Sequence, residues 1–460
     1  MILKQTYFLL CLTLLITSVT IAQEDTPWLD LFNGENFDGW TKKNGTAKYK
    51  IEDGAIIGIS ELGTPNTFMC TEKNYDDFIL EMDVNLAYGL NSGCQIRSNS
   101  IPEYRDGRVH GYQVELDPSD RRWTAGIYDE ARRGWLYPLT RNEKGAQAFN
   151  VGDWNHIRIE AIGHDIRTWV NGIQCANLVD DMTASGFIGL QVHSINDEAL
   201  VGKTIRWKNI RILTEDLEMY RMAPDPQVPQ FNYSSNLTEH EKRTGWRMLW
   251  NGETAAGWRA AKSENFPSAG WQMEDGVLTV LESGGAESAH GGDIVTRDRF
   301  SNFELIVDFK MTEGANSGIK YFVDSELNKG EGSAIGLEFQ VLDDKVHPDA
   351  KEGVGGNRTV GSLYDLIRAD NLSEPSRDQK RVSPTGWNRA RIVVKGGHVQ
   401  HWLNNIMVVE FDRWSQTFAA LVEKSKYAKW DNFGRGDSGR ILLQDHGNTV
   451  YFKNIKIREF

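Results

Sequence analysis

One stretch in the second half of the chain carries an acid and an amide on the same face of an expected strand. Residues 336–344 alternate in polarity, so that three apolar side chains point one way while Glu338 and Gln340 point the other. The solvated face of a strand usually carries Lys, Thr, Ser and mixed charges. A glutamate beside a glutamine instead indicates a cleft that forms hydrogen bonds with a polar ligand.

A second stretch, residues 440–446, has the same design. Gln444 and His446 share one face of the expected strand with Leu442, and Asp445 lies on the opposite face. Both stretches have weaker counterparts earlier in the chain. The elements that position these side chains are therefore expected to occur twice.

The chain contains an internal repeat. Seven landmarks recur in the same order, and Asn91-Ser92-Gly93 returns as Asn316-Ser317-Gly318. The interval between the copies grows from 225 residues at this motif to 253 near the end, so the second copy has extra loops at about 365–386 and 412–437. Long loops on a rigid sandwich often carry binding sites. We interpret the chain as a first domain (23–213), a linker (214–244) and a second domain (245–460).

Short alternating runs separated by Gly, Asn and Asp turns dominate each copy, for example residues 303–309, 317–323 and 389–395. Many strands with little helix predict an all-β fold, a two-sheet sandwich or jelly roll. The main helix is expected over residues 414–425. Residues 214–244 contain three prolines and no strand alternation, which predicts an extended linker.

The net charge of -13 argues against nucleic acid or an anionic membrane surface as partner, and leaves a neutral substrate as the default. Residues 1–22 have the pattern of a secretory signal, so we expect the protein to be exported, with the periplasm as the expected location. A lipid anchor at Cys11 is the alternative. No second apolar run is long enough to span a bilayer.

Removal of the signal leaves Cys70, Cys94 and Cys175, which lie in apolar runs and lack metal-type spacing. We expect buried free thiols. One disulfide with a spare thiol is the alternative.

The second copy carries an ordered set of motifs, which are Asn316-Ser317-Gly318, residues 336–344, Val360-Gly361-Ser362-Leu363-Tyr364-Asp365, His401-Trp402-Leu403-Asn404, Ser425-Lys426-Tyr427, Leu443-Gln444-Asp445-His446-Gly447 and Phe452-Lys453-Asn454-Ile455. This set resembles the 3-keto-disaccharide hydrolase family, long described as a domain of unknown function. The first copy resembles the family in a divergent form. The resemblance implies a concanavalin-like jelly-roll sandwich in two tandem copies. It also implies an exported enzyme that acts on glycosides already oxidised at C3 by a separate oxidoreductase.

The implied chemistry starts from the ketone at C3, which acidifies the hydrogen on C2. A general base removes this hydrogen, the enolate expels the group on C1, and hydration gives net hydrolysis. The candidate catalytic residues are Glu338, His401, His446 and Lys320. The expected substrate-binding residues are Gln340, Tyr364, Asn404, Gln444 and Asp445 in the second copy, and Arg97, Glu115, Tyr128 and His193 in the first.

Each of these candidates also has a structural interpretation. Glu338 and Gln340 could bridge neighbouring strands, and Lys320 could be an ordinary solvent-facing lysine. His401 and His446 could be satisfied core histidines.

A metal is a further possibility beside the enolate. Asp343 and His347, with Asp344 and Asp349, form a cluster that could hold a divalent cation, although a solvated acidic turn is the alternative. No other cofactor is indicated. Residues 316–318 are expected to form a turn that fixes backbone geometry.

The first copy departs from this pattern. Gln113 and Glu115 stand where Glu338 and Gln340 stand in the second copy, which moves the carboxylate by roughly 6 to 7 Å along the strand. Arg97 replaces a hydrophobic residue. The first copy is therefore either a second active site with a different substrate or a binding module that presents sugar to the other copy.

Two other functions compete with this interpretation. A non-catalytic carbohydrate-binding protein can have the same fold. A conventional glycosidase would need paired carboxylates, for which Glu338 and Asp343 are the candidates.

Overall fold

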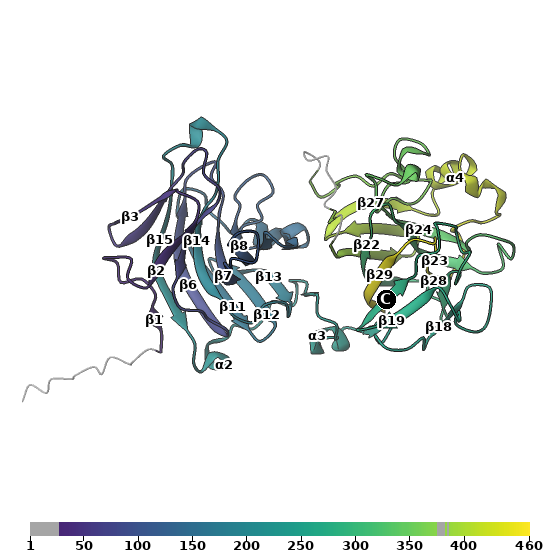
Figure 1. The fold of residues 1–460 in the computed structure, drawn as a ribbon, viewed down its shortest axis with the longest axis horizontal. Helices are drawn as coiled ribbons and strands as arrows, with labels where there is room; N and C mark the ends of the chain where they lie inside the picture. Colours follow the sequence, from purple (N-terminus) through teal and green to yellow (C-terminus); the bar gives the residue numbers. More distant parts are fainter. Residues whose placement is uncertain (1–26, 375–381, 384–385) are drawn as a thin grey trace, which may run out of the picture.

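The computed structural model describes residues 27–374, 382–383 and 386–460. The expected signal at residues 1–22 and Cys11 lie outside the described residues. Two all-β domains follow each other along the chain, as the internal repeat predicts (Figure 1).

The first domain consists of two sheets packed face to face. In order across the sheet, the larger contains β16 (Phe231–Asn232), β13 (Ile173–Val179), β12 (Asp165–Val170), β11 (Trp154–Ile162), β6 (Phe78–Leu86), β15 (Thr204–Leu213), β4 (Ala55–Ile59) and β3 (Lys48–Glu52), with β1 (Leu29–Asp30) beside β15. The smaller contains β10 (Gly134–Tyr137), β9 (Ile127–Glu130), β8 (His110–Leu116), β7 (Ser92–Asn99), β14 (Phe187–Val192), β5 (Thr67–Thr71) and β2 (Trp40–Asn44).

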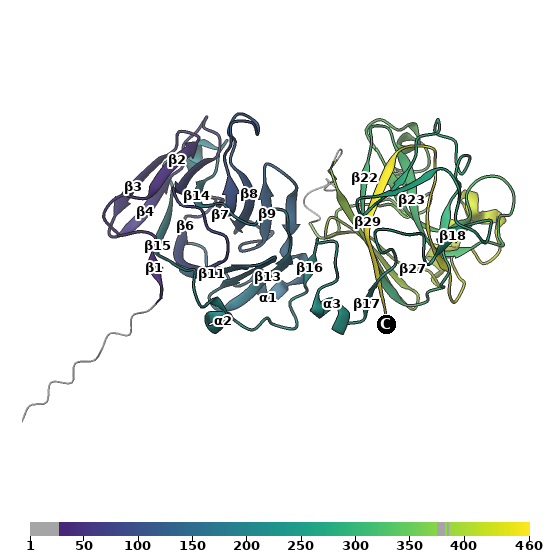
Figure 2. The ribbon, with the colours of Figure 1, turned by 60° about the horizontal axis from the view of Figure 1, so that its bottom comes forward.

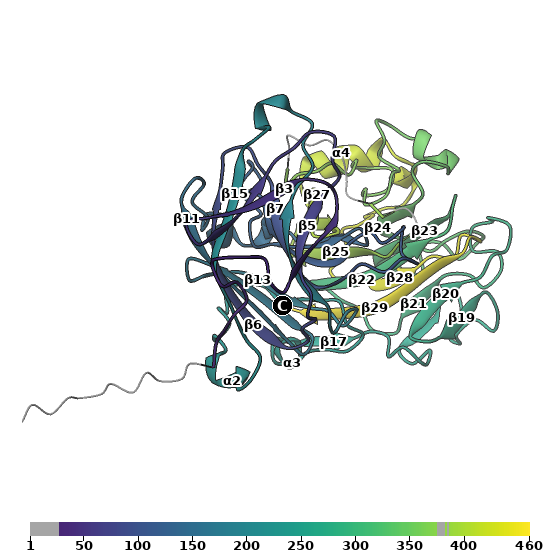
Figure 3. The same cartoon turned by 60° about the vertical axis from the view of Figure 1, so that its left-hand side comes forward.

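The second domain repeats this arrangement. Its larger sheet contains β19 (Trp271–Glu274), β20 (Val277–Val280), β29 (Val450–Glu459), β22 (Phe303–Met311), β25 (Asn388–Lys395), β26 (His398–Leu403) and β27 (Ile406–Asp412), with β17 (Trp246–Met248) beside β29. Its smaller sheet contains β18 (Trp258–Ala260), β21 (Ile294–Thr296), β28 (Arg440–Leu443), β23 (Asn316–Asp324) and β24 (Ile335–Leu342). Strands β28, β23 and β24 lie side by side (Figures 1 and 3).

Alternation along each strand builds the sandwich core. In β24, Leu337 and Phe339 point inward and are fully buried, and the Phe339 ring lies 6.3 Å from that of Phe309 on the facing β22. The opposite face of β24 carries the polar side chains. The expected jelly-roll sandwich in two tandem copies is therefore confirmed.

The α-helices of the described residues are short and lie outside the sheets. They are α1 (Glu143–Ala146), α2 (Leu217–Tyr220), α3 (Glu239–Arg243) and α4 (Gln416–Glu423). Helix α4 confirms the helix expected over residues 414–425, and the Ser415 side chain caps its first turn by accepting a hydrogen bond from the Phe418 N–H.

The segment between the domains forms more structure than the extended linker that its composition predicts. It contains α2, α3 and β16, and β16 pairs in parallel with β13 (Figure 2). The buried carboxylate of Glu241 in α3 lies 2.6 Å from the Lys456 ammonium group in β29 of the second domain. Proline content indicated a linker, but it could not reveal these tertiary contacts.

Tyr233, directly after β16, contacts both domains. Its hydroxyl group donates a hydrogen bond to the Leu136 carbonyl oxygen at 3.1 Å and accepts one from the Asn405 side chain at 2.8 Å. The Arg389 guanidinium lies 3.8 Å from the centre of its ring. The linker therefore fastens the two sandwiches to each other.

Cys70, Cys94 and Cys175 are free and buried, as expected. Within the described part of the chain, no helix combines the length and the apolar character needed to cross a membrane.

Candidate active site

A buried ion pair joins the last two strands of the smaller sheet of the second domain. Lys320 in β23 stands directly opposite Glu338 in β24, and its ammonium nitrogen is 3.6 Å from the carboxylate. Each residue is only 5% exposed. Lys320 also donates hydrogen bonds to the Ser333 hydroxyl group and to the Ala334 carbonyl oxygen. Lys320 is therefore not an ordinary solvent-facing lysine.

Residues 316–318 lie within β23 and do not form the expected turn. A Cβ atom on Gly318 would overlap Oε1 of Glu338 and lie 3.2 Å from Oε1 of Gln444. The glycine thus leaves the space in which these two polar side chains meet. The Asn316 side chain lies 3.5 Å from that of Gln340, on the same face.

The surroundings of Glu338 set its proton affinity. Burial raises the pKa of Glu338, and the positive charges of Lys320 and Lys426 partly offset this rise. Much of the Lys426 side chain is exposed, but its ammonium group interacts with the charges of Glu338 and Lys320. Loss of hydration at the ammonium group lowers the pKa of Lys426. Glu338 is thus a carboxylate of raised basicity held beside two cations.

A loop before β21 adds another carboxylate to this face. The exposed Glu287 accepts a hydrogen bond of 3.0 Å from the Gln444 side chain. Asp445 fixes the same loop, because its Oδ2 accepts hydrogen bonds from the N–H groups of Gly291 and Gly292. Asp445 has no exposed surface. Its contacts position the loop, and it does not have the exposure needed to touch substrate.

Tyr364 lies next to this cluster. Its hydroxyl group donates a hydrogen bond of 2.9 Å to Asp349, and the Lys426 ammonium lies 4.3 Å from the centre of its ring. Burial, together with the charge of Glu338, raises the pKa of Tyr364. Tyr364 is therefore a protonated hydrogen-bond donor at neutral pH.

Two histidines face each other at the end of the cluster. The rings of His347 and His446 are 6.2 Å apart and nearly perpendicular. Burial and the neighbouring His446 lower the pKa of His347. Nδ1 of His446 is buried and forms no hydrogen bond within the described residues.

The structure places His401 and Asn404 away from these groups. His401 is fully buried, its ring nitrogens contact the Tyr321 hydroxyl group and the Gly361 carbonyl oxygen, and burial lowers its pKa to about 4. His401 is thus a core histidine, the alternative that its sequence left open. Asn404 lies in the turn between β26 and β27, where it accepts a hydrogen bond from the Arg389 N–H.

The expected metal site does not form a ligand set. Both carboxylate oxygens of Asp343 accept hydrogen bonds from backbone N–H groups, those of Gly314 and Lys345. His347 accepts one from the Asp349 N–H through Nδ1. Among the described residues, no group of three or more His, Cys, Asp or Glu side chains is arranged to hold a metal.

The first domain has a cavity of about 700 Å³ at the corresponding place. Three of the expected residues, Glu115, Tyr128 and His193, line it. Arg97 does not. Its guanidinium is 1% exposed and binds Asp77 and the carbonyl oxygens of Asp76 and Gly163, which identifies Arg97 as a structural residue.

Sequence reasoning missed Glu287 and the ammonium group of Lys426. Lys426 belongs to a motif that carried the family resemblance, so a signal for it existed. Glu287 lies in a loop rich in Gly and Ser, 51 positions before Glu338, and no local pattern connects the two.

Comparison with known proteins shows the family of the chain. The sequence profile of the family described as "3-keto-alpha-glucoside-1,2-lyase-like domain" matches residues 27–213 and 245–458. A protein of Bacteroides thetaiotaomicron named 3-keto-disaccharide hydrolase is 35% identical over 235 residues, which are 46% of this chain and 78% of the relative.

Solved structures are similar to single domains. A Parabacteroides distasonis protein described as a candidate glycosyl hydrolase is 30% identical, with a TM-score of 0.42, and the match covers 49% of this chain and 99% of that chain. A carbohydrate-binding module of Bacillus subtilis is 19% identical, with a TM-score of 0.27, over 37% of this chain and 93% of the module. Because the family profile matches both domains, this chain belongs to the 3-keto-alpha-glucoside-1,2-lyase-like domain family.

Proposed function

We propose that the second domain cleaves 3-keto-glycosides at C1, with Glu338 as the general base that removes the proton from C2. The observation that carries the proposal is the buried Lys320–Glu338 pair on the polar face of the smaller sheet. The name of the B. thetaiotaomicron relative, a 3-keto-disaccharide hydrolase, supports the same substrate class.

The reaction starts with proton transfer. Glu338 accepts the proton from C2, and the electron pair of that C–H bond forms an enolate with the C3 ketone. The enolate then forms a C1–C2 double bond and expels the oxygen on C1, which takes up a proton. Addition of water to this enone, with the hydroxyl group at C1 and the proton at C2, completes net hydrolysis.

The surroundings of Glu338 suit the first step. A carboxylate with a raised pKa is a stronger base than an ordinary glutamate, and a base works best when its pKa approaches the working pH. Lys320 and Lys426 place positive charge where the enolate develops negative charge. Tyr364, the nearby hydroxyl donor, and His446 are the groups available to protonate the leaving oxygen.

A conventional glycosidase with Glu338 and Asp343 as its pair does not fit. Glu338 lies in β24 and Asp343 follows the end of that strand, so about 16.5 Å of extended backbone separates them at 3.3 Å per residue, and the odd spacing points the two side chains to opposite faces. Inverting glycosidases place their carboxyl groups roughly 6.5–9.5 Å apart and retaining ones closer, with both groups facing the same bond. The oxygens of Asp343 are also occupied by backbone N–H groups.

Glu338→Gln tests the assignment. We expect p-nitrophenol release from p-nitrophenyl 3-keto-α-glucoside to fall by about 10²- to 10⁴-fold in kcat/KM, because the amide cannot accept the C2 proton. Glu326→Gln, at an exposed glutamate of the same domain, is the matched control and should behave as the wild type. The wild type should release nothing from the unoxidised glucoside.

Two results would contradict the proposal, and a third would add a metal to it. Release from both glucosides, lost from both in Glu338→Gln, would indicate a conventional glycosidase. Saturable sugar binding without release from either would indicate a binding protein. Loss of activity in a chelator would reveal a metal that the described residues do not account for.

The proposal also covers the source of the substrate and the location of the enzyme. The substrate requires a separate oxidoreductase that oxidises C3 of the sugar first. The signal-like residues 1–22 support export, with the periplasm as the expected location.

A further inference from the structure

We propose that the first domain binds a neutral saccharide in its own cavity and does not cleave it. The inference is independent of the cleavage proposed for the second domain, because it rests on residues of the first domain alone. The cavity has a volume of about 700 Å³, within the range of sites that enclose small molecules.

Neutral amides replace the ion pair at the centre of this sheet. Gln95 in β7 stands directly opposite Gln113 in β8, in the positions that Lys320 and Glu338 occupy in the second domain. Gln95 donates a hydrogen bond to Gln113 Oε1 at 2.5 Å, and Gln191 donates another to the same oxygen at 3.0 Å. An amide is not a base at neutral pH, so no group at this position can remove a C2 proton.

The carboxylate of Glu115 is held by amide side chains. Glu115 lies two residues further along β8, and its oxygens accept hydrogen bonds of 2.8 Å from Asn91 and from Gln113. Two residues of strand correspond to about 6.6 Å, more than a shared mechanism would tolerate. Glu115 therefore shapes the polar floor of the cavity and does not replace Glu338.

Basic and acidic side chains both line the cavity. Three arginines and three acidic residues line it, which are Arg105, Arg108, Arg121, Asp106, Glu115 and Glu130. Arg108 is paired with Glu130 at 3.0 Å. Such a lining favours a neutral ligand over an anion or a cation.

Polar atoms without partners and an aromatic wall indicate the class of ligand. Oδ1 of Asn91, which lines the cavity, and the nearby Oε1 of Gln191 accept no hydrogen bond within the described residues. Tyr128 and Trp135, with ring centres 5.4 Å apart, form one wall. A pyranose ring matches both features. Its hydroxyl groups can donate hydrogen bonds to the amide oxygens, and its apolar face can pack on an aromatic ring.

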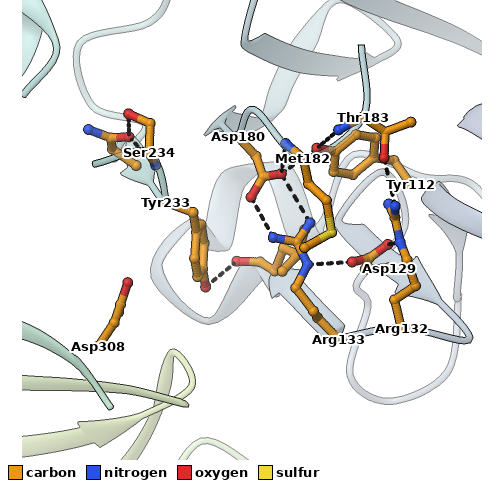
Figure 4. A network of polar contacts seen from close by, with 12 residues as sticks. Tyr112, Asp129, Arg132, Arg133, Asp180, Met182, Thr183, Tyr233, Ser234 and Asp308 are labelled. Atoms are coloured by element: carbon orange, nitrogen blue, oxygen red, sulfur yellow. Dashed lines mark hydrogen bonds and ion pairs between the residues drawn. The ribbon is translucent and has the colours of Figure 1, made fainter. Parts of the chain in front are cut away.

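The aromatic wall is rigid. Tyr128 and Trp135 lie on the hairpin of β9 and β10, and Asp129 points to the opposite side of the same strand. On that side the Arg133 guanidinium lies between the carboxylates of Asp129 and Asp180, and its Nη1 is 2.7 Å from Oδ2 of Asp180 (Figure 4). A wall fixed from behind loses little conformational freedom when a ligand binds.

The test is equilibrium dialysis of the full chain with p-nitrophenyl α-glucoside, at saccharide concentrations up to the millimolar range. We expect Tyr128→Ala to weaken binding to the first domain at least 10-fold. Tyr88→Ala removes an exposed tyrosine of the same domain that does not line the cavity, and it should bind as the wild type. His193→Ala is a second cavity variant for use if Tyr128→Ala lowers the melting temperature.

Two results would overturn the inference. If the cavity variants and Tyr88→Ala bind the glucoside equally, the cavity is not a saccharide site. If Glu338→Gln still releases p-nitrophenol from the 3-keto derivative and Glu115→Gln in addition abolishes the release, the first domain is catalytic. Absence of cleavage by the wild type would refute the function proposed for the second domain but not this one.

Discussion

Each domain carries a buried glutamate in its smaller sheet, and the two glutamates have different partners. Glu338 is held beside two lysines, whereas Glu115 has only amides as direct hydrogen-bond partners. Burial, only partly offset by hydrogen bonds from Gln113 and Asn91, raises the pKa of Glu115 from 4.5 to about 7. We therefore expect the stability of the protein to depend on pH through Glu115.

Glu115→Gln should stabilise the protein at high pH. The folded state binds the Glu115 proton more tightly than the unfolded state, so the unfolding free energy of the wild type falls as pH rises from about 4.5 to about 7. The loss amounts to about 3 kcal/mol, from 1.36 kcal/mol per pKa unit. We expect the variant to match the wild type at pH 4.5 and to melt at a higher temperature at pH 8, by calorimetry.

Glu198→Gln controls for the loss of one negative charge, because Glu198 is exposed. The free Oδ1 of Asn91 allows the Asn91 side chain to turn and accept a hydrogen bond from the amide introduced at position 115 or from a protonated Glu115. A variant less stable than the wild type at pH 8 would show that Glu115 is stabilised as a charged group.

The sequence predicted which side chains share a face better than it predicted which are buried. Alternation placed Glu338 and Gln340 together correctly, because strand periodicity is a local property. It could not decide between core and surface for Lys320 and His401, since burial depends on the sheets and loops that cover a strand. Glu287 comes from a distant loop, and only the fold brings it near.

At the scale of elements, β23 is the strand on which the site depends. Gly318→Ala should lower kcat/KM by on the order of 10²-fold, because the added methyl group occupies the position of the Glu338 carboxylate. The backbone of Gly318 does not adopt the left-handed conformation, so alanine is compatible with the strand. Steady-state kinetics with the 3-keto glucoside measure the effect.

Gly93→Ala is the counterpart in the first domain, where a Cβ would lie 2.5 Å from the Gln113 side chain. It should leave cleavage by the second domain intact. Equal losses of cleavage in both variants would mean that Gly318→Ala acts through general destabilisation.

Elements with strong local signals were predicted well. The helix expected over residues 414–425 is α4, and the strands at 336–344 and 303–309 are β24 and β22. The strand expected over residues 440–446 ends earlier, at Leu443, because Asp445 turns to bind the loop at Gly291 and Gly292. Such an ending depends on a contact with a loop more than 150 residues earlier in the chain and has no local signature.

At the scale of the whole molecule, Tyr233 is one of several residues that join the two domains. Tyr233→Ala removes the ring beneath the Arg389 guanidinium and the hydroxyl group that contacts both Leu136 and Asn405. A buried cation–π contact contributes about 2 kcal/mol. We expect the two domains to melt in separate transitions and the radius of gyration from small-angle scattering to increase.

Tyr233→Phe is the matched control, since it keeps the ring and loses the hydroxyl group. It should fall between the wild type and Tyr233→Ala in both measurements. Identical melting and scattering of all three proteins would show that the Glu241–Lys456 pair and the other contacts hold the domains together without Tyr233.

A docked linker also changes how a long ligand meets the protein. If each domain binds one unit of the same oligosaccharide, attachment at the first makes attachment at the second an intramolecular event. The effective concentration of the second unit then depends on whether the oligosaccharide spans the fixed separation of the two sites. Because Tyr233 and the other contacts between the domains hold that separation, chain length, and not only sugar identity, becomes a basis for selecting substrates.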